Sequence, residues 1–195
     1  MTRTRIAAVA LTASLALTAC GGGDDKKSSD DTSGDSKATA AAATGAEQSA
    51  DDFTFNAPDG WEAKDASAMP SVNFEVLAAD PNDKDGFTDN VNVVSDPAIA
   101  NFQDLDDRAD AAKKGLAMLS TENMKVEDPV SLDGDDATVI SYTAKVGSNK
   151  IDQRQYYVAH GDNGYVVTFS YSEDRPDAEQ QEIAESVAAS WSWKS

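Results

Sequence analysis

Few residues of this chain have the chemistry for catalysis. Its 195 residues include one histidine, His160, and one cysteine, Cys20. Nucleophilic catalysis needs a nucleophile beside a general base, and the sequence has no G-x-S-x-G stretch to present a serine. His160 falls at the end of an expected strand, beside a turn, so we expect a surface or hairpin histidine and not a general base. We therefore predict no catalytic residues and no enzyme activity.

The sequence also offers few residues that could bind a metal ion or a cofactor. One histidine and no second thiol leave only carboxylates to complete a zinc site. The sequence has no G-x-x-x-x-G-K-[ST] or G-x-G-x-x-G stretch, so we expect no nucleotide cofactor. The segment Asp80–Asn90 is rich in oxygen ligands, but with Gly86 at position 6 of an EF-hand loop, Pro81 occupies position 1. We predict no metal and a solvated loop; an irregular, weak cation site is the alternative.

The three tryptophans are the remaining candidates for binding. Trp61, Trp191 and Trp193 would suit a sugar-stacking platform or the lining of an apolar cleft. We expect instead that Trp61 and Trp191 close the core, and that Trp193, near the chain end, is more exposed. A hydrolase using paired carboxylates is a further alternative, but nothing singles out a pair among the 35 acidic residues.

The N-terminus has the pattern of a secretory signal. Arg3 and Arg5 precede the run from Ile6 to Leu17, which is apolar apart from Thr12 and Ser14. A basic start followed by such a short apolar run is typical of a signal peptide, and the run is too short for a comfortable membrane span. We predict a signal peptide over residues 1–19.

The end of that run, Leu17-Thr18-Ala19-Cys20, resembles a bacterial lipobox. The resemblance implies cleavage after Ala19 and lipidation of the Cys20 thiol, with acyl chains such as palmitate. Each buried CH₂ contributes about 0.8 kcal/mol, so two or more acyl chains hold a protein at a bilayer. We predict that Cys20 anchors the protein to the extracytoplasmic face of the cell membrane. The alternative is an ordinary secreted protein with an incidental cysteine.

Residues 20–52 have the composition of a tether. They are rich in Gly, Ser, Thr, Asp and Ala and contain no aromatic residue, so they cannot bury enough surface to order themselves. The whole chain has a formal charge of −19, which argues against binding to nucleic acid. Anionic lipid head groups would also repel this charge. We expect a domain held near the membrane but off its surface.

Residues 53–195 carry the patterns of one globular domain. Apolar stretches bounded by turn residues predict strands, and apolar residues from Leu105 to Leu119 recur at helical spacing. We predict a helix over Asn101–Ser120, a second helix from Pro176 towards Trp191, and strands within 53–63, 71–79, 90–95, 124–132, 137–146, 150–160 and 164–172. Because the strands come in runs and have apolar residues on both faces, we predict an α+β fold with a largely antiparallel sheet of about six strands, covered on both faces.

A family resemblance rests on four short features: Trp61 after a Pro-x-Gly turn, the Asp133-Gly134 turn before a strand, the stretch GYVVTFS, and the closing IAESVAASW. Together they resemble the PsbP-like fold, and within it the actinobacterial LpqN-type lipoproteins. The resemblance spans about Phe53 to Trp193. It implies an α/β/α sandwich and a partner-binding or accessory role, and it carries over no functional residues.

These observations predict an acidic, membrane-anchored lipoprotein whose single domain binds a protein partner of the cell envelope. The alternative is a carrier or sensor that binds an apolar or glycolipid ligand in a cleft between sheet and helix. A closed core would favour a protein partner, and a deep apolar pocket of several hundred Å³ would favour a ligand.

Overall fold

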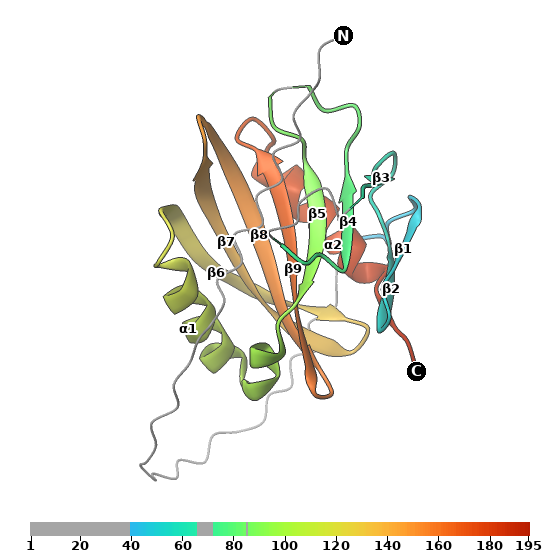
Figure 1. The fold of residues 1–195 in the computed structure, drawn as a ribbon, viewed down its shortest axis with the longest axis vertical. Helices are drawn as coiled ribbons and strands as arrows, with labels where there is room; N and C mark the ends of the chain where they lie inside the picture. The colour runs from blue at the N-terminus through green and yellow to red at the C-terminus, as the bar shows by residue number, and fades with distance from the viewer. Residues whose placement is uncertain (1–39, 66–71, 85) are drawn as a thin grey trace.

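The computed structural model of the chain describes residues 40–65, 72–84 and 86–195 (Figure 1). Its elements are, in chain order, β1 (Glu47–Ser49), β2 (Phe53–Asn56), β3 (Glu62–Ala63), β4 (Val76–Ala79), β5 (Asn90–Ser95), the 3-10 helix η2 (Pro97–Asn101), α1 (Leu105–Leu116), β6 (Thr121–Leu132), β7 (Asp135–Val146), β8 (Asn149–His160), β9 (Asn163–Ser172), α2 (Asp177–Ala189) and β10 (Ser192–Trp193).

A seven-stranded antiparallel sheet forms the centre of the fold. Its strand order is β3-β4-β5-β9-β8-β7-β6, so the last four strands in sequence form a meander. A separate three-stranded sheet pairs β1 and β10 with β2, which joins the two ends of the domain. The predicted α+β fold is confirmed. The strands that the sequence patterns did not separate, β1, β3 and β10, are two or three residues long, too short for alternation to distinguish them from loops.

Helices cover opposite faces of the main sheet. In Figure 1, α1 lies in front of the sheet and α2 behind it. Ala112 and Leu116 of α1 pack in one core cluster, whereas Ala184 and Val187 of α2 pack in the other. The predicted α/β/α sandwich therefore describes the central layers, and the small sheet lies on the α2 side. No helix within the described ranges is long and apolar enough to cross a bilayer.

The first helix is shorter than the predicted span of Asn101–Ser120. The Asp104 carboxylate accepts hydrogen bonds from the amides of Asp106 and Asp107, so the α-helix begins at Leu105. The preceding 3-10 helix, η2, has its own cap at Asp96 and brings Ile99 into the core. The prediction merged two helices because the apolar spacing extends beyond the cap.

Strand β6 is longer than the predicted short strand over residues 124–132. It runs for 12 residues, although two register irregularities interrupt its pairing with β7. One lies between Glu122 and Lys125, where Asn123 has a positive φ of 56°. The other lies between Glu127 and Val130 and accommodates Pro129, which has no amide hydrogen to donate. These bulges hide the alternation that identifies a strand in sequence.

The predicted boundary between tether and domain, Asp52 to Phe53, is too late in the chain. Residues 40–52 belong to the fold, because β1 pairs with β2 and Gln48 is buried. Upstream of β1, the Ala43 amide donates a hydrogen bond to the Ser186 carbonyl of α2 (2.8 Å), and Ala43 is buried. The segment lacks large apolar residues, and its order comes from contacts with parts of the chain that lie far away in sequence.

A buried arginine fastens α1 to the sheet. The Arg108 side chain is only 5 % exposed, and its guanidinium donates to the backbone carbonyls of Phe102, Asp136 and Tyr157 at distances of 2.8 to 3.3 Å. These carbonyls come from the loop before α1, from β7 and from β8. A single side chain therefore ties three segments together.

We predict that Arg108→Met lowers the free energy of unfolding by about 2–3 kcal/mol, because buried carbonyls would lose their donors. Denaturant unfolding measures this change. Lys114→Met is the matched control, since Lys114 is exposed on the same helix, and we expect it to change the free energy of unfolding by no more than about 0.5 kcal/mol. Equal losses in the two variants would show that the Arg108 contacts contribute nothing.

Candidate functional site

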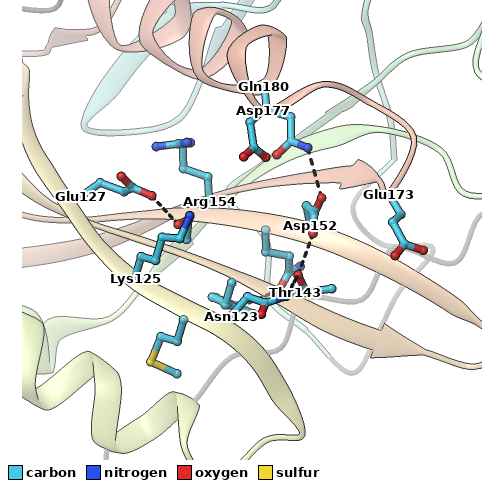
Figure 2. A pocket seen from close by; sticks show the side chains of 13 residues that line it. Asn123, Lys125, Glu127, Thr143, Asp152, Arg154, Glu173, Asp177 and Gln180 are labelled. Atoms are coloured by element: carbon cyan, nitrogen blue, oxygen red, sulfur yellow. Dashed lines mark hydrogen bonds between the residues drawn. The ribbon is translucent and has the colours of Figure 1, made fainter.

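A polar hollow of about 480 Å³ lies where the start of α2 faces strands β6, β7 and β8 (Figure 2). We call it the α2–sheet hollow. Most of its lining side chains are polar or charged. They are Asn123, Met124, Lys125, Glu127, Ser141, Tyr142, Thr143, Asp152, Gln153, Arg154, Glu173, Asp177 and Gln180.

Strand register brings the sheet side of the hollow together. Lys125, Ser141 and Arg154 are direct neighbours across β6, β7 and β8. Two residues along, Thr143 is paired with Asp152. Side chains two residues apart on a strand share a face, so both rows point to the α2 side of the sheet. Farther along the same face, larger apolar side chains pack under α2 and leave no such space.

The acidic side of the hollow is held by hydrogen bonds. Asp152 accepts from the Thr143 hydroxyl (2.9 Å) and from the Gln180 amide (3.3 Å). The same Gln180 amide donates to the Arg175 carbonyl (2.8 Å), which fixes its orientation. Figure 2 shows Asp152 between Thr143 and Gln180, with Asp177 and Glu173 on the same side. This side is therefore an ordered acidic surface.

The basic side is formed by Lys125 and Arg154, next to Glu127 (Figure 2). The Ser141 hydroxyl donates to Glu127 (2.6 Å), so this carboxylate has a partner. Arg154 is half-buried, and its Nε atom is buried without a hydrogen-bond partner in the part of the chain that the structure describes. Neither Lys125 nor Arg154 forms an ion pair with another described residue. The hollow thus has a basic row beside an acidic one.

One tyrosine among the lining residues belongs to the other face of the sheet, because the Tyr142 side chain packs in the core cluster on the α1 side. The Tyr142 hydroxyl donates to Gln153 (2.6 Å), and burial raises the pKa of Tyr142 well above its usual value. A phenol with a raised pKa keeps its proton at neutral pH and does not serve as a base. The polar and charged side chains on the α2 face offer charge recognition and hydrogen bonding.

His160 lies at the far end of β8, away from the hollow. Its Nδ1 atom is 2.7 Å from an Asp135 carboxylate oxygen, and its ring stacks on Trp193 with a centroid distance of 4.2 Å. The Trp193 ring nitrogen donates to the Leu132 carbonyl (3.0 Å). His160 thus takes part in fastening the C-terminal strand, as a hairpin-end histidine.

The tryptophans lie largely as predicted. Trp61 and Trp191 are 6 % and 5 % exposed, and both belong to the core cluster on the α2 side. Trp191 stacks on Phe53 and Phe55, with centroid distances of 4.5 and 5.2 Å. Trp193 is half-buried and is the most exposed of the three. They do not form a platform, because Trp61 and Trp191 are packed inside.

Three acids of the loop Asp80–Asn90, namely Asp80, Asp83 and Asp89, accept hydrogen bonds from within the loop or from β9 and the residues after it. The Asp80 carboxylate accepts from the Asn82 amide (2.8 Å), and Asp83 accepts from the Asp89 amide (3.0 Å). Asp89 is fully buried and accepts from the Ser172 amide (2.7 Å) and from Arg175 (2.5 Å). Among the described residues, no group of three or more His, Cys, Asp or Glu side chains is arranged to hold a metal ion.

The predicted lipobox, Leu17, Thr18, Ala19 and Cys20, lies outside the described residues. The anchor at Cys20 therefore remains a prediction from sequence. The sequence analysis missed the α2–sheet hollow. A signal existed, because the two-residue turn Gly147-Ser148 sets the β7–β8 register and thereby pairs Ser141 with Arg154. The position of Lys125 was not readable, since it depends on the bulge in β6.

No family model matches this sequence, and no curated protein does. Solved structures are similar in fold. Cyanobacterial PsbP (CyanoP) of Synechocystis is 20 % identical with a TM-score of 0.51, and the match covers 73 % of this chain and 86 % of that one. The chain therefore has a PsbP-like fold, as its sequence features predicted.

Two further structures are similar at lower scores. LpqN of Mycobacterium tuberculosis, described as involved in cell envelope biogenesis, is 14 % identical with a TM-score of 0.45, covering 73 % of this chain and 83 % of LpqN. A protein of Bacteroides thetaiotaomicron is 16 % identical with a TM-score of 0.46 and matches 73 % of this chain. This chain spans only 45 % of the length of the Bacteroides protein.

The buried Asp89 gives the fold a pH dependence. Burial raises the pKa of Asp89 to about 6, although the Ser172 amide and Arg175 act in the opposite direction. The native state then binds a proton more tightly than the unfolded chain, so this stabilisation is complete below pH 3.8 and is lost as the pH rises through about 6.

We predict that wild type loses about 3 kcal/mol of stability relative to Asp89→Asn between pH 3.5 and pH 7, because the amide does not titrate. Urea unfolding of both proteins across this range measures the difference. A difference in the free energy of unfolding that stays constant or grows with pH would contradict the prediction.

Proposed function

We propose that this chain is an extracytoplasmic lipoprotein, anchored through Cys20, whose PsbP-like domain is a non-enzymatic module that binds a protein partner of the envelope. The observation that carries the proposal is the combination of a closed core with a charged, open hollow. Apolar side chains fill the space on both faces of the main sheet. The hollow between α2 and the sheet is lined mainly by polar and charged side chains, which favour a polar partner over an apolar ligand.

The surroundings of the candidate catalytic residues support a non-enzymatic role. His160 is engaged by Asp135 and stacked on Trp193, and no serine or threonine hydroxyl bonds to its ring in the described part of the chain. The single cysteine belongs to the lipobox pattern. An acidic domain at a membrane is suited to recognising a basic protein surface, because complementary charge accelerates encounter and selects partners.

We predict that Cys20→Ser releases the protein from the membrane fraction, since the thiol that would carry the acyl chains is replaced by a hydroxyl. Fractionation of the expressing cells, followed by mass spectrometry of the N-terminal peptide, measures both location and lipidation. Ser33→Ala, downstream of the lipobox, is the matched control and should stay with the membrane. An unlipidated wild-type N-terminus would contradict the anchor.

A photo-crosslinking residue in the hollow should capture the partner. We predict that Asn123→p-benzoylphenylalanine, placed on the rim of the hollow, gives a discrete protein adduct in intact cells. Asp162→p-benzoylphenylalanine, in the exposed β8–β9 turn at the other end of the sheet, is the control and should not give that adduct. Recovery of lipid without a protein adduct would overturn the proposal in favour of a lipid carrier.

A further inference from the structure

Arg154 has an unusual environment for a charged side chain. It lies on β8, half-buried, and its buried Nε–H group has no acceptor among the described residues. Removing a guanidinium donor from water without supplying a partner costs free energy. In a chain with 35 acidic and 16 basic residues, carboxylates that could pair with it are abundant. Because Arg154 has no carboxylate partner in the described part of the chain, its guanidinium is available to bind an external anion.

The other two arginines of the described residues have internal roles. Arg108 binds three backbone carbonyls, and Arg175 pairs with the buried Asp89. Arg154 makes neither kind of contact. Its cross-strand row also contains Lys125, with the small Ser141 between them. Ser141 thus has a cation on each side, and its hydroxyl donates to the Glu127 carboxylate (2.6 Å).

Within the residues that the structure describes, the acids of the hollow form no ion pair with this row. Glu127 accepts from Ser141, and Asp152 is held by Thr143 and Gln180. Asp177 and Glu173 lie on the side of Asp152, across the hollow from Lys125 (Figure 2). Apart from Glu127, the negative groups therefore lie across the cavity from the positive ones, which suits a ligand with both charges and a matching separation.

We propose that the α2–sheet hollow binds an acidic side chain of a basic polypeptide partner, with the carboxylate against Arg154 and a neighbouring ammonium against Asp177 and Glu173. This inference rests on the proposed function and names the chemistry of its partner. The guanidinium offers the fork that pairs with a carboxylate. The acidic rim then meets the basic surface around that anchoring side chain.

A carboxylate fits this hollow better than a phosphate. The lining contains two basic and four acidic side chains, counting Glu127, Asp152, Glu173 and Asp177. Doubling the charge of the ligand doubles both its attraction to the two cations and its repulsion by the four carboxylates, and the carboxylates outnumber the cations. The pairing of Arg154 with a monoanion is therefore the favoured one.

Short peptides test this assignment on the full chain kept in detergent. We predict that acetyl-Lys-Glu-Lys-amide shifts the NMR signals of the Arg154 Nε–H group and of the Asn123 and Gln180 side-chain amides. The peptide acetyl-Lys-Gln-Lys-amide and inorganic phosphate should bind at least tenfold more weakly. Arg154→Gln should weaken the Lys-Glu-Lys peptide at least tenfold, while Lys145→Gln, which removes a charge from an exposed position on β7, should not.

Equal binding of the Glu and Gln peptides, stronger binding of phosphate, or full binding by Arg154→Gln would each overturn the carboxylate site. The NMR spectrum of Arg154→Gln away from the hollow shows whether the variant is folded. If it is misfolded, the comparison of the three probes on the wild-type chain still decides. A protein adduct from Asn123 that persists in Arg154→Gln would remove this site and leave the proposed function standing. If the peptide binds as predicted but only lipid is captured in cells, the carboxylate site would stand and the proposed function would be overturned.

Discussion

The main sheet presents apolar side chains on both faces, so both faces must be covered, and the rest of the structure follows from how that is done. On one side, α1 and η2 supply the cover; on the other, α2 and the small sheet do so. Helix α2 begins at Asp177, directly after Pro176, which sets where the cover starts. At that point the sheet carries Ser141, Thr143 and Arg154 in place of large apolar side chains. The hollow is the consequence.

The chain has few basic residues, 16 against 35 acidic ones. An excess of acids keeps the domain soluble but also destabilises it through repulsion, so each cation has a large local effect. Arg108 and Arg175 are placed where they tie separate segments together. Several lysines form surface pairs, such as Lys113 with Asp110, which contribute little to stability. Against this pattern, the unpaired Arg154 is the exception that the fold itself does not explain.

Much of the fold was predictable because its signals are local. The strands β7, β8 and β9 alternate around two-residue turns, and their bounds match the predicted stretches to within two residues. Other features depend on contacts that are distant in sequence. The order of residues 40–52 depends on β2, on α2 and, through the bond from the Lys194 amide to the Asp52 carbonyl, on the C-terminus. Composition alone therefore assigned this segment to the tether.

Part of the α2–sheet hollow was predictable from local sequence signals, and part depends on an irregular strand pairing. Its β7–β8 half follows from the turn at Gly147-Ser148, whereas its β6 side depends on the irregularity between Glu127 and Val130, which shifts the pairing of Lys125 relative to the β6–β7 turn. A bulge adds local twist and re-aims the side chains beside it.

Without the irregularity between Glu127 and Val130, the register set at the β6–β7 turn would place Val126, not Lys125, opposite Ser141. An apolar side chain would then stand beside Arg154, and the basic row would have one cation instead of two. The irregular edge strand that obscured the fold in sequence is thus the feature that gives the hollow its charge pattern.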